Sequence, residues 1–228
     1  MRPGPREGEL ATEQILINGQ VTETLRKHLE PGLRAVFVGL NPSPVSVRAG
    51  HYYQGRLGRR FWNRMREHGI VPWEQVGAED ELAIKLGFGF ADLVRRPTLR
   101  GDGLTKCEKV QGAADLLARL RQLGDRPPIV FVFKEAWRFA APGLERAGFR
   151  VLRFPSPFTA TDLVASQMRE LVVALAPWSD AGPGRPSMEA EETINPATPF
   201  KAPGRPASER HADLSSLAAP SSLGPGHG

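Results

Sequence analysis

The chain has 228 residues, enough for one ordinary domain and a tail, with 30 Lys and Arg against 25 Asp and Glu. The formal charge of +5 suits a polyanionic partner, although a generically basic protein has the same balance. A single cysteine excludes an internal disulfide and a cysteine-based zinc site, and no apolar run reaches the roughly 18 residues that span a bilayer. Because the first residues also lack the apolar core of a signal peptide, we expect an intracellular, cytoplasmic protein.

The N-terminal part begins with residues 1–18, which are rich in Gly, Pro and Glu and are predicted to be a flexible lead-in. From Val21 the spacing of Val21, Leu25 and Leu29 predicts a helix that Pro31-Gly32 ends.

Apolar runs and helical patterns then alternate along the chain. Buried strands are expected at 34–40, 87–94, 128–133 and 149–155. Helices are expected at 61–69, 79–87, 104–124, 134–148 (interrupted near Pro142) and 161–176. This alternation predicts an α/β domain over 19–178, a three-layer α/β/α sandwich with a central, mostly parallel sheet.

The composition changes abruptly after residue 178. Residues 179–228 hold 8 Pro, 6 Gly and 7 Ser and show almost no apolar periodicity. Such a segment buries too little surface to offset its chain entropy, so we expect a disordered Pro/Gly/Ser-rich tail.

The loop after the first buried strand carries an asparagine between fixed neighbours. The strand ends in Gly39-Leu40-Asn41, followed by Pro42-Ser43-Pro44. The prolines restrict the backbone around Asn41, and a carboxamide can hold a water without carrying charge. Ligands bind at the carboxyl ends of parallel strands, so Asn41 is a candidate catalytic residue, although an ordinary turn asparagine has the same local sequence.

Two further segments strengthen this interpretation. The last strand ends in FPSPFTA (154–160), a second strand followed by Pro-Ser-Pro. Between the two loops, HYYQGRLGRRFW (51–62) offers aromatic faces that can stack on a base and arginines that can contact phosphates.

These motifs occur in a characteristic order. GLNPS, GHYYQG, RFW, GFGFADLVRRPT and FPSPFTA together resemble the mismatch-specific uracil/thymine DNA glycosylases of the uracil-DNA glycosylase superfamily. The resemblance covers roughly residues 20–177 and implies an α/β/α sandwich that removes a mismatched or damaged base from DNA.

The resemblance also implies roles for individual residues. Asn41 matches the asparagine that positions the attacking water, and Tyr53 the aromatic residue that stacks on the flipped base. The loop that approaches the pyrimidine is matched by Gly39, Leu40, Pro42 and Ser43, and the serine of the second motif by Ser156. Phe158 falls where the family inserts a wedge into the duplex, and Pro157 lies where the family has a residue that helps to grip the unpaired guanine and the backbone.

The expected partner is double-stranded DNA with a mismatched or deaminated base, bound by a monomer that needs no cofactor or metal. Candidate phosphate contacts are Arg56, Arg59, Arg60, Arg95, Arg96 and Arg100. No matched motif supplies a Schiff-base lysine, and Lys134 is interpreted as a surface residue at a helix start. We therefore expect a monofunctional enzyme.

Asp92, in GFGFADLV, is a second candidate catalytic residue, because a carboxylate near the pocket could act as a general base. Its alternative role is to cap the following turn. The second motif departs from the family at Phe154, Pro157 and Ala160, so the preference for guanine opposite the excised base stays open.

Three other functions stay open at this point. One is a damaged-DNA-binding module without excision, although the presence of Asn41 argues against it. Another is a glycosylase for deaminated purines such as hypoxanthine. The third is a nucleotide-binding domain, but the first strand is not followed by a G-x-G-x-x-G loop.

Overall fold

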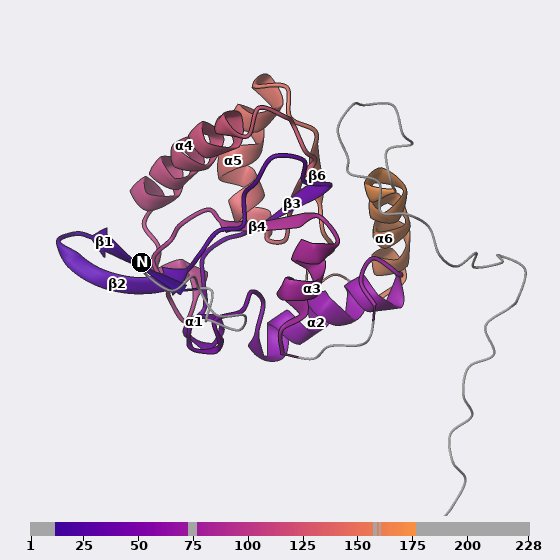
Figure 1. Cartoon of the computed structure of the whole chain (residues 1–228), viewed down its shortest axis with the longest axis horizontal. Coiled ribbons are helices and arrows are strands. Elements are labelled where there is room, and N and C mark those ends of the chain that lie inside the picture. The colour runs from indigo at the N-terminus through magenta and orange to yellow at the C-terminus, as the bar shows by residue number, and fades with distance from the viewer. Residues whose placement is uncertain (1–11, 73–76, 157–158, 160, 177–228) are drawn as a thin grey trace, which may run out of the picture. The chain divides into compact units, whose positions relative to one another are not determined.

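A parallel sheet forms the centre of the protein (Figure 1). The computed structural model describes residues 12–72, 77–156, 159 and 161–176, all of which belong to the first of two parts of the chain, 1–181 and 182–228. The sheet has the strand order β4-β3-β5-β6 and is parallel throughout. Its strands are β3 (Ala35–Gly39), β4 (Phe88–Asp92), β5 (Ile129–Phe131) and β6 (Val151–Arg153).

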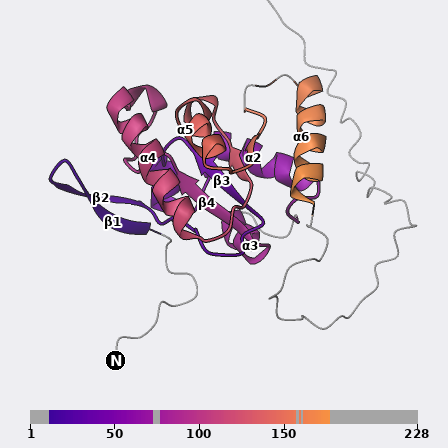
Figure 2. The ribbon, with the colours of Figure 1, turned by 90° about the horizontal axis from the view of Figure 1, so that it is seen from above.

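Helices cover both faces of this sheet, as Figure 2 shows from above. One face packs against α2 (Gly55–Glu67), α3 (Glu79–Lys85) and α6 (Thr161–Leu175). The other face packs against α4 (Lys106–Gln122) and α5 (Lys134–Arg146). The predicted three-layer α/β/α sandwich is confirmed. None of the described helices is both long and apolar enough to cross a membrane.

Strands β3 and β4 are buried on both faces of the sheet. Every residue of β3 and of β4 is buried, which explains why their sequences are continuous apolar runs and do not alternate. On the α2 face, the Phe37 ring lies 5.5 Å from Phe88 and 5.8 Å from Phe90 between centroids. This aromatic packing sets the level at which both strands end, and therefore the position of the residues that follow them.

A hairpin precedes the sandwich and corrects the prediction for this region. Strands β1 (Thr12–Ile17) and β2 (Gln20–Leu25) pair in antiparallel register, so the predicted helix from Val21 is wrong and the lead-in 1–18 contains a strand. Asn18 and Gly19 join the strands with φ of 50° and 78°, as the two central residues of a type I′ turn require. The turn and the β-branched residues of β2 outweigh the helical spacing of three apolar side chains.

Two helices also differ from expectation. The short α1 (Pro44–Ala49) was not predicted; it begins with a proline at its first position and ends at Gly50 in the left-handed conformation. In α5 the helix runs through Pro142 without interruption. Pro142 is exposed, so water can satisfy the carbonyl that loses its hydrogen bond.

Candidate active site

The carboxyl ends of β3 and β4 form the base of the site. Gly39 is opposite Asp92 in the parallel register, and the ladder continues beyond both strands. Leu93 N donates to Gly39 O at 3.0 Å and Val94 N donates to Leu40 O at 2.9 Å. The two loops that follow therefore leave the sheet side by side, which brings the Asn41 loop next to residues 95–98.

The Asn41 side chain is held through its nitrogen. Nδ2 donates to Thr98 Oγ1 at 2.7 Å, to Pro42 O at 3.1 Å and to Arg96 O at 3.2 Å. Thr98 Oγ1 donates its own proton to Arg100 O at 2.7 Å, so it can only accept from Asn41. Three acceptors around one atom fix the orientation of the carboxamide. No described residue donates to Oδ1, which is left to accept from a water or a ligand.

Asp92 has a buried carboxyl group without a hydrogen-bond donor among the described residues. Its side chain ends β4 and only 8% of the residue is exposed. Burial raises the pKa of Asp92 from 3.8 to about 7, and the positive charge of Arg95 acts in the opposite direction. A carboxyl group with this pKa can take up or release a proton near neutral pH, which an ordinary surface aspartate cannot.

Gly39 and Tyr53 enclose this carboxyl group. A Cβ added at Gly39 would collide with Asp92 Oδ1 and lie 3.5 Å from Tyr53 Cε1, so the absence of a side chain lets the three residues converge. Tyr53 has a φ of 54° and packs on Phe61 with centroids 4.4 Å apart. Its hydroxyl is buried and has no partner among the described residues, and burial keeps the pKa of Tyr53 well above its ordinary value. The predicted base-stacking residue is thus at the site, where the rings of Tyr52, Phe61, Trp62 and Phe90 surround it.

The loop that carries this tyrosine is anchored by the acidic start of α3. Asp80 accepts from Tyr52 N at 2.7 Å and lies 2.9 Å from His51 Nδ1, an interaction that raises the pKa of His51. Glu79 accepts from Gln54 Nε2 at 3.3 Å. Sequence analysis missed both carboxylates, although a run of three acidic residues at a helix start was a visible signal. Asp80 and Glu79 act on the site by holding the loop that carries Tyr53.

The other residues predicted to approach the base use their side chains for structure. Leu40 is buried in the core on the α4 face. Ser43 Oγ accepts from Ser46 N at 3.2 Å and caps α1. Pro42 has no N–H, whereas the Ser43 N–H donates to no described residue. In this loop Ser43 N is therefore a backbone donor open to a ligand.

The second loop follows β6 and is attached to α2. Arg64 NH1 donates to both Pro155 O and Ser156 O at 2.7 Å. Burial, and then the charge of Arg60, lower the pKa of Arg64. The sequence pattern did not reveal this contact, because it joins residues about 90 positions apart. The predicted DNA-binding residues Pro157 and Phe158, the second of them the predicted wedge, lie outside the described residues.

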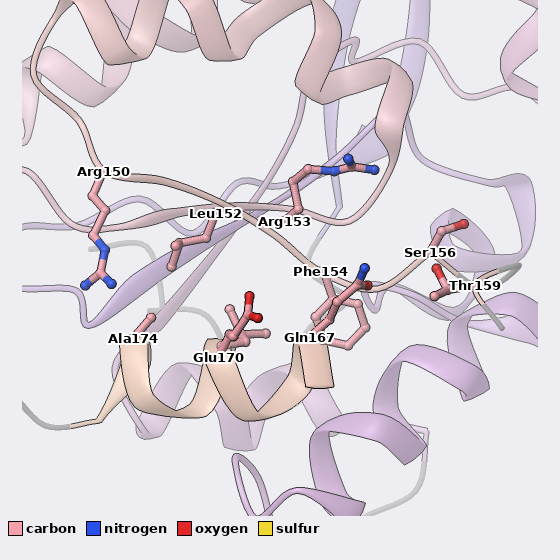
Figure 3. A pocket seen from close by; sticks show the side chains of 10 residues that line it. Arg150, Leu152, Arg153, Phe154, Ser156, Thr159, Gln167, Glu170 and Ala174 are labelled. Carbon is pink, nitrogen blue, oxygen red and sulfur yellow. The ribbon is translucent and has the colours of Figure 1, made fainter. Parts of the chain in front are cut away.

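A groove of about 370 Å³ lies between β6 and α6, and Figure 3 shows its lining. Gln167 and Glu170 project from α6 toward β6, whereas Arg153 points away from them and lies over the Trp137 ring at 5.2 Å. Of the predicted site residues that the structure describes, Ser156 alone lines this groove. The groove is therefore distinct from the surroundings of Asn41 and Asp92.

The candidate phosphate contacts fall into two groups. Arg56, Arg59 and Arg60 are exposed on α2. Arg96 instead forms a bidentate ion pair with Glu108, with distances of 2.6 Å and 3.1 Å, which contributes to lowering the pKa of Glu108 to about 2. A phosphate at Arg96 would have to compete with this internal carboxylate.

The other two candidates lie on either side of Arg96. Arg95 pairs with Glu13 of the hairpin at 2.5 Å, and Arg100 lies 3.0 Å from Asp102 with 81% of its side chain exposed. Arg100 is thus the more accessible of the two. Across the described ranges, no group of three or more His, Cys, Asp or Glu side chains is arranged to hold a metal ion.

Comparison with known protein families places this site in context. The model of the uracil DNA glycosylase superfamily matches residues 26–177, more than half of the chain. The match contains Asn41, Asp92 and Ser156 and begins directly after the β1–β2 hairpin. It indicates a DNA-binding hydrolase that acts on the bond between base and sugar. The chain belongs to the uracil DNA glycosylase superfamily.

Proposed function

We propose that the protein is a monofunctional DNA glycosylase of base excision repair that flips uracil, or thymine, out of mismatches with guanine and excises it. The observation that supports this proposal most directly is the Asn41 carboxamide, anchored through Nδ2 by three acceptors with Oδ1 left for a water. The adjacent strand end supplies Asp92, whose carboxyl group has a pKa of about 7.

In the proposed reaction, Asn41 Oδ1 accepts a hydrogen bond from a water and holds it near the sugar carbon. The water oxygen bonds to that carbon as the base leaves with the electrons of the N-glycosidic bond, and Asp92 takes the proton of the water. Positive charge develops on the sugar and negative charge on the pyrimidine, which the Ser43 N–H can stabilise. Fixing the water in advance supplies part of the rate enhancement as a proximity effect.

The proposed preference for mismatches follows from the need to extrude the base. Extrusion costs a few kcal/mol, and a wobble pair lowers this energy. Arg56, Arg59 and Arg60 are exposed together on α2 and suit the DNA backbone.

The lysines support the monofunctional assignment. Lys134 is exposed at the start of α5. The buried Lys109 forms an ion pair with Glu135 at 2.6 Å, so its amine is already bound by a carboxylate. An abasic site is the expected product.

The experiment is a cleavage assay on labelled duplexes that carry G·U, G·T, A·U or G·hypoxanthine, followed by alkali. Alkali-dependent cleavage at G·U, greater than at A·U and abolished by Asn41→Ala, is the expected result. Cleavage without alkali would contradict the monofunctional assignment. Tight binding to G·U without excision would replace the proposal with a damage-binding module, and excision of hypoxanthine alone would replace it with a purine glycosylase.

A further inference from the structure

Leu99 is the most exposed large apolar side chain in the part of the chain that the structure describes. It lies in the loop between β4 and α4, and 85% of its surface is accessible. Single exposed leucines are common on protein surfaces, so exposure by itself assigns no role. Leu99 differs from an ordinary exposed leucine in the hydrogen bonds that fix the backbone around it.

Both neighbours of Leu99 are fixed to the active site. Thr98 N donates to Pro42 O at 3.2 Å, and Thr98 Oγ1 accepts from Asn41 Nδ2 at 2.7 Å. The same hydroxyl donates to Arg100 O at 2.7 Å, which closes a tight turn around Leu99. The turn therefore holds Leu99 outward and prevents it from folding back onto the protein.

The next residue packs against the same loop. A Cβ added at Gly101 would lie 2.5 Å from Leu40 Cδ2, so the backbone at Gly101 is already in close contact with the residue before Asn41. The Leu99 turn and the Asn41 loop consequently move as one body.

This attachment determines where Leu99 must be when DNA is bound. Asn41 can act only if the sugar of the extruded nucleotide comes within reach of its carboxamide. The Cα atom of Leu99 is one step of about 3.8 Å from Thr98, which touches that carboxamide. Leu99 is therefore brought to the duplex together with the substrate.

We propose that Leu99 is an apolar wedge that packs against the base stack beside the extruded nucleotide. The inference rests on the proposed function and adds a DNA contact from a loop separate from the second motif. Aliphatic side chains inserted at base steps open the stack and stabilise a kinked duplex. The adjacent Arg100 is 81% exposed and can meet the phosphate of the same step.

The test compares Leu99→Ala with Leu99→Met, which keeps an apolar side chain, and with Val173→Ala, a control on α6 where the valine is 77% exposed. Each variant is assayed by single-turnover excision on a G·U duplex and on a duplex with uracil opposite an abasic-site analogue, where no pair must be broken. On the G·U duplex, Leu99→Ala should lower the single-turnover excision rate about tenfold, which is the scale of one base-stacking contact. On the unpaired uracil the loss of rate should be clearly smaller. Leu99→Met and Val173→Ala should resemble the wild type.

A second readout does not depend on excision. 2-Aminopurine is placed beside the uracil, and its fluorescence is measured on binding in the Asp92→Asn background, which slows excision and keeps the hydrogen bond between Asn41 and Thr98. Adding Leu99→Ala should remove most of the fluorescence increase that reports unstacking. An unchanged increase, or an equal loss of excision on both substrates, would overturn the wedge. If the wild type excises no base, the proposed function fails, and the fluorescence still decides whether Leu99 enters the stack.

Discussion

The two loops at the carboxyl edge of the sheet are held by different kinds of contact. In the first loop, three hydrogen bonds hold the Asn41 side chain and two prolines restrict the backbone. In the second, the described contacts at Pro155 and Ser156 include two hydrogen bonds from one arginine, Arg64. The contacts of the first loop fix a side chain that must hold a water in position, whereas the described contacts of the second loop fix its backbone.

The strand beside the first loop, β4, ends in a group that is unfavourable to bury, the Asp92 carboxyl. Asp92 is buried with no hydrogen-bond donor from the described residues, an arrangement that stability alone would not favour. Groups of this kind are expected at functional sites, where a shifted pKa is useful for chemistry. Substitutions in and beside the two loops therefore test this comparison through the excision rate and through the free energy of unfolding.

The largest effect is expected from Asp92→Asn, which keeps the shape of the side chain and removes its basicity. Excision from G·U should fall by about 10² to 10⁴. In the wild type, the rate should rise with pH through about 7, where Asp92 ionises, and level off above it. Single-turnover rates from pH 5 to 9 measure both effects. A wild-type profile that is flat across pH 7 would contradict the role of Asp92 as a base.

The same substitution should increase stability at high pH. Since the folded-state pKa of Asp92 is about 7 and the ordinary value is 3.8, ionisation disfavours the folded state by up to about 4 kcal/mol above pH 7. This penalty is absent below pH 3.8, where both states are protonated, and it grows between the two values. The unfolding free energy of Asp92→Asn should therefore exceed that of the wild type at pH 8, with a difference that shrinks toward pH 5. Urea unfolding at these pH values measures it, and a constant difference would argue against a buried, ionisable Asp92.

Asn41→Ala should lower single-turnover excision by about 100-fold or more, because the water loses its fixed position. Affinity for a duplex with an abasic-site analogue should change little, since the side chain positions water and contributes little to DNA binding. A comparable loss of affinity would indicate that Asn41 mainly holds the loop together.

Thr98→Val should reduce the rate by about tenfold, since Asn41 loses its shortest hydrogen bond while the side chain keeps its size. Thr98→Ser retains the hydroxyl and should restore most of the rate. If Ser and Val variants behave alike, the hydroxyl does not position the carboxamide.

Arg64→Lys should have the smallest effect, a several-fold loss of excision rate confined to substrates in which the uracil is paired. A lysine ammonium cannot reproduce the contacts of the planar guanidinium with Pro155 O and Ser156 O, so the second loop should become less ordered. The control is Arg121→Lys, at an exposed position on α4. Excision of uracil opposite an abasic-site analogue should be almost unaffected; a loss equal to that on G·U would mean that Arg64 supports the whole domain.

Much of the sandwich was predictable because its strands and helices carry local signals. Continuous apolar runs predicted all four strands of the parallel sheet, and helical spacing predicted α3, α4, α5 and α6 within a few residues. The start of α2 was placed six residues too late, because residues 55–60 were interpreted as part of the preceding loop. The hairpin was missed even though Asn18-Gly19 is a strong turn signal, because Val21, Leu25 and Leu29 also fit a helical face. Where a local pattern fits both a helix and a strand, contacts with the rest of the chain decide which of the two forms.

The site shows the same division. Asn41 was identified from its position after an apolar run and Asp92 from its position within one. The structure brings the ends of β3 and β4 together. Thr98 and Arg64 were not singled out, because their hydrogen bonds join segments that are far apart in the sequence. Nothing in the local sequence indicates which carbonyl or amide such a side chain will meet.

The sequence by itself determined the α/β alternation, the Asn41 loop and the acidic side chain at the end of β4, since each depends on residues adjacent in the chain. The tertiary structure decided the orientation of the Asn41 carboxamide, the burial that raises the pKa of Asp92, and the outward mounting of Leu99. Hydrogen-bond geometry and desolvation depend on atoms from several segments within a few ångströms of one another, and only the folded chain brings those atoms together.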